Sequence, residues 1–328
     1  MEYIESIPWE ETVVVPKIVQ NESTDRPFIQ ANTIPTTLKE LQDKHIIPVF
    51  VKDNEPVISH NDFIETTQAV VSNVFSSQQI LQPSIRLSHP VMGRIPDAKH
   101  KPANQLQEHK KTLYYERMAF IIELPSYTAE VGGNKLSLTV GGVKAFNLDN
   151  LYNRKGADEH FKIFIGFKNQ VCTNLCVWSD GFQSDLKVSS IGQLQACIQN
   201  LIERYSSSYQ LQQMEQLTQY SLTEQQFAQI VGRCRMYQHL PNHMRSNIPP
   251  MLLGDNQIGA ICKDFYRDEN FNKQEDGSIN LWRLYNLLTG ANKSTYIDNF
   301  LDRSVNAYHF TEQIRFALQR QVFNWYLN

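Results

Sequence analysis

The pattern of apolar and polar residues changes near residue 190. Before it, apolar and polar residues alternate in short runs such as "KLSLTV" (residues 135–140), and this alternation is typical of β-strands. After it, apolar residues recur at three- and four-residue spacing, as in "IGQLQACIQNLIER" from residue 191, and this spacing predicts helices. We therefore expect an α+β protein, with a predominantly antiparallel sheet, flanking helices and a mainly helical C-terminal region.

The same pattern divides the chain into three parts. Residues 1–44 mix four prolines with polar residues and predict an irregular N-terminal arm. Residues 45–190 form the expected α+β sheet domain, which begins with an edge strand in "HIIPVFV". Residues 191–328 form the expected helical region packed on that domain.

Several elements can be placed from local signals. Before residue 190 we expect a helix over 59–75 with Ser59 or Asn61 as N-cap, a loop or extended segment over 86–102, a short helix within 103–117, a strand over 117–124, a glycine turn at 132–134, and a bend or bulge at Gly141 and Gly142. Beyond it we expect a helix that starts from a capping box at Ser221 and Glu224, and further helices over 255–266, 279–289 and 307–318.

The stretch "HFKIFIGFKNQVCTNLCVWSDGF" (residues 160–182) carries unusual residues in a strand pattern. Cys172 and Cys176 would stand about 13 Å apart along an extended strand, too far to share one zinc ion. A hairpin with the three-residue loop 168–170 would place the apolar residues of both strands on one side. The other side would then carry Lys162, Phe164, Cys172, Asn174, Cys176 and Trp178, which is a face suited either to cover by a helix or to contact with a ligand.

Charge is distributed unevenly along the chain. The net charge is -3, from 31 basic and 34 acidic residues. Residues 86–117 hold 7 basic and 3 acidic residues (+4) together with three histidines, so this segment would become more positive in mildly acidic conditions. No apolar run is long enough to span a membrane, and the acidic start does not resemble a secretory leader, so we expect a cytoplasmic protein with reduced cysteines.

The basic segment and the mixed strand face suggest contact with nucleic acid. Lysine and arginine neutralise phosphates, and an aromatic side chain on a sheet can stack an unpaired base. The candidate residues are Arg86, Arg94, Lys99, Lys101, Lys110 and Lys111 for phosphates, and Lys162, Asn174 and Trp178 on the sheet. The simpler interpretation is a solvated basic surface beside a Trp packed under a helix.

Signatures of catalysis are absent from the sequence. There is no phosphate-binding loop, dinucleotide fingerprint, HExxH or GxSxG, and we expect neither a cofactor nor a metal. Noncatalytic binding of single-stranded or locally opened DNA is the favoured function. A protein-interaction or self-association module that uses the Gln-rich helices and the acidic N-terminal segment is the alternative, and an enzyme without a recognisable motif is the third.

Four stretches carry a family resemblance: "SHPVMGRIP", "GGVKAFNLDNLY", "EHFKIFIGFKNQVCTNLCVWSDG" and "LYNLLTGANKSTYIDNFLDR". Together they resemble an uncharacterised domain family from mobile genetic elements of Bacteroides-type bacteria. The pair "NQVCTN" and "LWRLYNLLTG" is more remotely similar to phage/plasmid-like proteins, although Asn169 and Leu175 replace an arginine and a glycine of that pattern. The resemblance implies a setting in plasmid, phage or conjugative-element biology.

Overall fold

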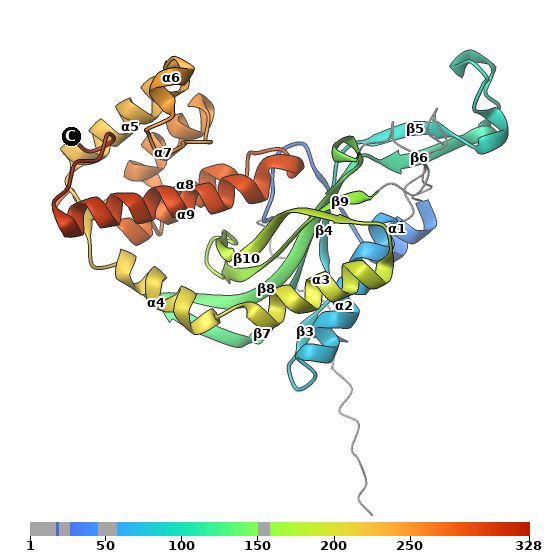
Figure 1. The fold of residues 1–328 in the computed structure, drawn as a ribbon, viewed down its shortest axis with the longest axis horizontal. Coiled ribbons are helices and arrows are strands. Elements are labelled where there is room, and N and C mark those ends of the chain that lie inside the picture. Colours follow the sequence, from blue (N-terminus) through green and yellow to red (C-terminus); the bar gives the residue numbers. More distant parts are fainter. Residues whose placement is uncertain (1–17, 20–26, 45–57, 150–157) are drawn as a thin grey trace, which may run out of the picture.

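The computed structural model describes residues 18–19, 27–44, 58–149 and 158–328 (Figure 1). Its centre is a six-stranded antiparallel sheet with the strand order β10-β9-β8-β7-β4-β2. These strands are β2 (Ile34–Thr36), β4 (Ser84–Leu87), β7 (Arg117–Val131), β8 (Asn134–Ala145), β9 (Glu159–Asn169) and β10 (Leu175–Val188). Three further pairs of short strands are β1 (Ile18–Val19) with β3 (Ile80–Leu81), β5 (Pro90–Arg94) with β6 (Lys111–Tyr115), and β11 (Ser221–Leu222) with β12 (Ile279–Asn280).

Helices flank the sheet and form most of the C-terminal region. The helices are α1 (Leu38–Lys44), α2 (His60–Val74), α3 (Ile191–Arg204), α4 (Ser207–Leu217), α5 (Glu224–His239), α6 (Asn242–Arg245), α7 (Asp255–Arg267), α8 (Leu281–Asn292) and α9 (Ile297–Arg320). Short 3-10 turns are η1 (Pro96–Ala98), η2 (Ala103–Gln105), η3 (Glu108–Lys110) and η4 (Phe146–Leu148). The expected α+β class is confirmed.

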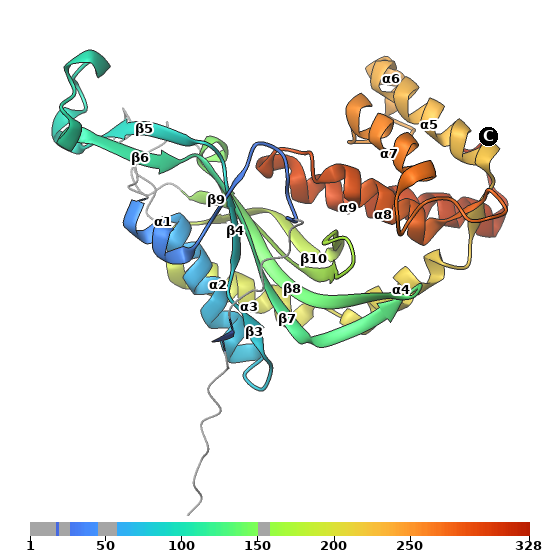
Figure 2. The same cartoon turned by 180° about the vertical axis from the view of Figure 1, so that it is seen from behind.

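Both faces of the sheet are buried. On one face, Phe63 of α2 makes edge-to-face contacts with Phe120 and Phe161, at centroid distances of 5.0 and 4.9 Å. On the other face, the N-terminal half of α9 contributes Phe300 to a second apolar cluster that contains Phe164 of β9. Figures 1 and 2 show α2 and α3 on one side of the strands and α8 and α9 on the other. Burial on both sides explains why the strands are almost continuously apolar.

The glycine pair in β8 has a different role from the one expected. The strand runs without a bulge through Gly141 and Gly142, and the irregularity in its pairing lies between Leu124 and Thr128 of β7. A Cβ atom on Gly142 would lie 2.4 Å from the ring of Phe63. The glycine therefore lets α2 approach the sheet closely, and the predicted bend was wrong because sequence alone does not show the helix that needs this space.

The sequence predicted the presence of these helices correctly, but it did not always predict the residue at which each helix begins. Ser59 caps α2 as expected, in a capping box with Asp62. In α5, the box is formed by Thr223 and Gln226 in place of Ser221 and Glu224. Ser221 pairs with Asn280 in the β11–β12 ladder, so the helix begins after that contact.

Other predicted elements had mixed outcomes. Helices α7, α8 and α9 are confirmed, although α8 begins two residues later than expected and α9 begins ten residues earlier. Residues 34–44 contain β2 and α1, so the expected irregular arm was wrong for this part, whereas the expected strand over 45–51 lies outside the described residues. The short helix within 103–117 was also wrong, because two 3-10 turns and β6 occupy that segment.

The β9–β10 hairpin pairs in a different register from the one expected, so the side chains of β10 lie on the opposite faces of the sheet. Lys168 pairs with Leu175, so six residues separate the paired positions and Cys176 shares a face with Phe167. Leu175 and Val177 instead join the cluster with Phe164 on the other face. Because both faces are buried, hydrophobicity could not choose between the two registers.

Candidate nucleic-acid interface

The mixed strand face is covered by helices and not by solvent. Trp178 is 8% exposed and lies against Tyr308 of α9 at a centroid distance of 3.8 Å and against Tyr209 of α4 at 5.9 Å. Lys162 forms an ion pair with Asp302 of α9. The structure therefore favours the interpretation in which a helix covers this face, and the proposed base-stacking role of Trp178 has no exposed surface to support it.

The turn between β9 and β10 docks onto α8 through a buried polar network. The amide of Asn169 donates to Oδ1 of Asn286 at 3.1 Å, and the amide of Asn174 donates to the Asn286 carbonyl at 2.9 Å. All three asparagines are buried. The two stretches "NQVCTN" and "LYNLLTG" are thus the two halves of one structural contact, and Asn174 is a docking residue.

The tightest part of this turn is supported from the end of α8. Thr173 has φ +59°, a left-handed conformation that is strained for a β-branched residue. The ammonium group of Lys293 donates to Oγ1 of Thr173 at 2.8 Å and to the carbonyl of Cys172. These hydrogen bonds stabilise the strained turn. The role that the structure supports for residues 172 and 173 is therefore a structural one.

The cysteines of this stretch are poor nucleophiles and poor metal ligands. Burial raises the pKa of Cys172 to about 11 and raises the pKa of Cys176 further. Among the residues that the structure describes, no group of three or more His, Cys, Asp or Glu side chains is arranged to hold a metal ion. The geometry therefore offers no basis for thiolate or metal chemistry in these parts of the chain.

The six basic candidates do not lie together. Arg86 on β4 donates to Oγ1 and the carbonyl of Thr33, the latter at 2.8 Å, and burial lowers its pKa. This arginine fixes β2 to β4. The other five candidates, Arg94, Lys99, Lys101, Lys110 and Lys111, belong to the β5–β6 ribbon (residues 90–115), which Figures 1 and 2 show projecting from one end of the sheet.

The fold of the ribbon brings together cations that are several residues apart in sequence. The guanidinium of Arg94 donates to the carbonyl of Lys101, and the amide of Ile95 donates to the carbonyl of Lys110 at 3.1 Å. The pKa of Lys110 is lowered, first by a hydrogen bond with the Lys101 side chain and then by its positive charge. The negative charge of Asp97 offsets part of this lowering, although neither ammonium group forms an ion pair with a carboxylate among the described residues. Lys111, in contrast, forms an ion pair with Glu108.

Two adjacent lysine side chains form a candidate binding position for an anion. A hydrogen bond between two lysine side chains requires one of them to lose its proton, because an ammonium group has no acceptor. An oxygen-rich anion such as phosphate can accept from both and let both stay charged. The Lys101–Lys110 pair, whose side chains are half-buried, is therefore the best candidate for a phosphate contact.

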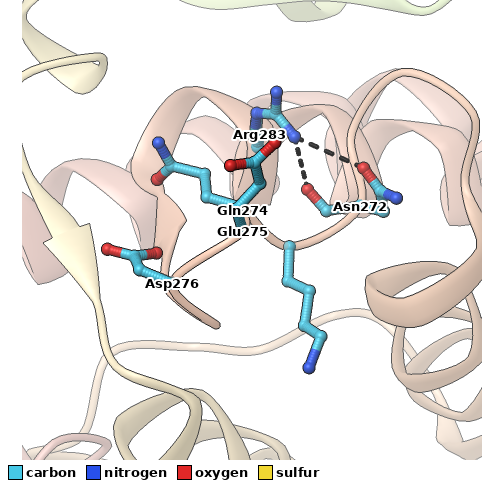
Figure 3. Close-up of a pocket in the computed structure, with 6 residues that line it drawn as sticks. Asn272, Gln274, Glu275, Asp276 and Arg283 are labelled. Carbon is cyan, nitrogen blue, oxygen red and sulfur yellow. Dashed lines mark hydrogen bonds between the residues drawn. The ribbon is translucent and has the colours of Figure 1, made fainter.

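One surface depression offers a second candidate. It encloses about 590 Å³ and is lined by Asn272, Lys273, Gln274, Glu275, Asp276 and Arg283 (Figure 3). Arg283 donates to the backbone carbonyl of Asn272 at 2.5 Å and to its side-chain oxygen at 3.4 Å, so this arginine holds the loop before α8. Lys273 forms an ion pair with Glu224 of α5, and Asp276 accepts hydrogen bonds from Ser278, so these two charges are engaged within the protein.

The excess of basic residues in this segment is visible in the sequence, whereas the fold of the segment is not. The short strands β5 and β6 have five residues each, with Pro90 and Gly93 in the first, so no helix or strand period stands out. The docking of the turn on α8 had one possible signal, which was the presence of Asn286 in the otherwise apolar "LWRLYNLL". A polar residue on a buried helix face needs a polar partner.

Fold and site together define an α+β protein with a locked β9–β10 turn and a projecting basic ribbon. The chain belongs to the family described as "Domain of unknown function, B. Theta Gene description" (DUF3871), whose model matches residues 9–327. The expected membership of an uncharacterised Bacteroides family is thereby confirmed. No curated protein and no solved structure matches the chain. Within the described residues, no helix combines the length and the apolar composition needed to cross a membrane.

Proposed function

We propose that this protein is a noncatalytic DNA-binding accessory that contacts the phosphate backbone through the β5–β6 ribbon. The observation that carries the proposal is the Lys101–Lys110 pair, in which two half-buried side chains of like charge meet in the ribbon and neither forms an ion pair with a carboxylate among the described residues. Phosphate is the anion that DNA presents at high density, and it interacts readily with lysine ammonium groups.

The distribution of charge supports the same proposal. The ribbon carries five basic and two acidic residues, a formal charge of +3, whereas the remainder carries 26 basic and 32 acidic residues, a charge of -6. Most of the chain therefore repels a polyanion, and the ribbon attracts it. Such a distribution orients the protein so that the ribbon meets DNA first.

The proposal rests on fewer residues than the sequence suggested. Its contacts are Arg94, Lys99, Lys101, Lys110 and Lys111. Arg86, Lys162, Asn174 and Trp178 are engaged elsewhere in the fold. We retain the setting in a mobile genetic element as part of the proposal, because proteins of such elements commonly act on DNA.

Fluorescence anisotropy of labelled DNA against the full chain, repeated across a salt series, tests the proposal. The informative variant is Lys101→Gln/Lys110→Gln. The matched control is Lys39→Gln/Lys263→Gln, which removes the same charge from two exposed lysines on α1 and α7.

The expected effect follows from counterion release. Each phosphate contact contributes about 0.9 to the slope of log K against log salt, so the loss of two contacts should flatten the slope by about 1.8 and weaken binding about sixtyfold at 0.1 M salt. The control should keep the wild-type slope. Equal slopes for the two double variants, or no binding by the wild type at low salt, would overturn the proposal.

A protein-interaction module is the second candidate, and one observation favours it. Phe316 near the end of α9 is exposed, as are Val322 and Phe323 in the segment that follows the helix, and Phe323 is 76% exposed. Exposed aromatic residues often mark contact surfaces. Light scattering of the purified chain distinguishes the candidates: a defined oligomer that is broken by Phe323→Ser, together with no DNA affinity, would favour this one.

A further inference from the structure

The ribbon has a regular register that determines which side chains share a face. Met92 pairs with Leu113 and Arg94 pairs with Lys111, and paired residues of an antiparallel ladder lie on the same side. Because side chains alternate along a strand, Met92 and Arg94 also share a side. This face therefore combines an apolar side chain with two cations.

Met92 is the unusual member of this face. Its side chain is 63% exposed, whereas Leu113 opposite it packs against the core. Tyr115, at the base of the ribbon, is buried. A long, flexible and apolar side chain thus extends into solvent between a buried base and the basic tip.

The dimensions of the ribbon match the major groove of duplex DNA. Two paired strands lie about 4.8 Å apart and five residues extend about 13 Å, whereas the groove is about 12 Å wide and 8.5 Å deep and admits a two-stranded ribbon. The flanking cations complement the phosphates on either side of the groove.

Single-stranded DNA fits the described surface less well. Its binding relies on aromatic side chains that stack bases. The ribbon has two aromatic residues, of which Tyr115 is buried and Tyr114 is half-buried, and Trp178 lies beneath α4 and α9. The ribbon can fill a groove but offers no open aromatic surface for a base.

We propose that the β5–β6 ribbon enters the major groove of duplex DNA, with Met92 against base edges and Lys101 and Lys110 on phosphates. This inference rests on the proposed DNA-binding function and names its substrate as the duplex. Contact of Met92 with the methyl group of thymine supplies apolar contact in the groove.

The test compares one labelled 20-base-pair duplex with each of its separated strands, at fixed salt, against the wild type, Met92→Ala and the control Met236→Ala. Met236 is a similarly exposed methionine on α5. We expect the duplex to bind at least tenfold more tightly than either strand. Met92→Ala should weaken duplex binding three- to tenfold without changing the salt slope, and Met236→Ala should have no effect. A major-groove ligand, methyl green, should compete, whereas the minor-groove ligand netropsin should not.

The contrary outcomes separate the two proposals. Binding to single strands that equals or exceeds duplex binding, while still depending on Lys101 and Lys110, would overturn the duplex inference and leave the DNA-binding function standing. Competition by netropsin alone would overturn the groove assignment. If neither DNA binds, both proposals fail. A change in oligomeric mass on Met92→Ala, with no change in duplex binding, would make the ribbon a self-association surface and would also overturn the inference.

Discussion

The buried contact between the β9–β10 turn and α8 makes a quantitative prediction about stability. The perturbation is Asn286→Ala. This change removes the acceptor of the Asn169 amide, which donates at 3.1 Å and is fully buried. The backbone carbonyl of residue 286 remains and still accepts from Asn174.

The size of the stability loss follows from the interactions that Asn286→Ala removes. A buried donor without a partner costs about 1–3 kcal/mol. The lost side-chain packing adds about 1 kcal/mol, and the better helix propensity of alanine returns about 0.5 kcal/mol. We expect Asn286→Ala to lower the free energy of unfolding by about 1.5–3.5 kcal/mol.

Urea unfolding followed by far-UV circular dichroism measures this loss. Asn299→Ala, at an exposed position in α9, is the matched control and should stay within about 0.5 kcal/mol of the wild type. The double variant Asn169→Ala/Asn286→Ala should lose about 1 kcal/mol less than the sum of the single variants, because both remove the same bond.

Two results would refute the reasoning. One is an Asn286→Ala variant as stable as the Asn299→Ala control. The other is a variant that keeps its stability but loses DNA binding, since the turn would then be a binding element and not a structural contact.

Three further predictions concern other buried groups. Gly142→Ala should lower the melting temperature, because its Cβ would overlap an aromatic ring of α2, whereas Gly192→Ala in α3 has open space and should raise the temperature slightly. A thiol reagent at pH 8 should leave Cys172 unmodified in the native chain, since its raised pKa of about 11 keeps only about 0.1% of it as thiolate; rapid labelling of this residue by mass spectrometry would contradict the burial. Lys144→Met should cost about 3–5 kcal/mol in urea unfolding, because it removes the ammonium group that neutralises the buried carboxylate of Glu159 at 2.6 Å; a loss under 1 kcal/mol would show that this pair is not buried as described.

The sequence predicted elements that have one buried face and one solvated face. The helix α2 was placed to within a residue, because Ser59 and the apolar residues that follow it give independent signals for its start and its buried side. The turn at Gly132 and Gly133 was likewise predicted, and both residues have positive φ. The register of the β9–β10 hairpin was not predicted. Both faces of these strands are buried, so no difference in hydrophobicity between the faces shows which register is correct.

The sequence predicted which kind of residue makes up the candidate site, but it did not predict how these residues are arranged in space. The excess of basic residues over 86–117 is visible in the sequence. Lys101 and Lys110 come together because β5 pairs with β6. Neither short strand has a sequence pattern that predicts this pairing. Burial of Trp178 depends on α4 and α9, which follow it by about thirty and more than a hundred residues. Contacts at such separation leave no local pattern.

The most direct test of the central claim is the DNA affinity of a chain without the ribbon. Residues 91–114 are replaced by Asn-Gly, so that the paired residues Pro90 and Tyr115 are joined by a two-residue turn and the buried Tyr115 is kept. Circular dichroism and a cooperative thermal transition confirm that the sheet still folds. We expect this variant to lose measurable binding to duplex DNA at 0.1 M salt. A folded variant that binds with the affinity of the wild type would contradict the account.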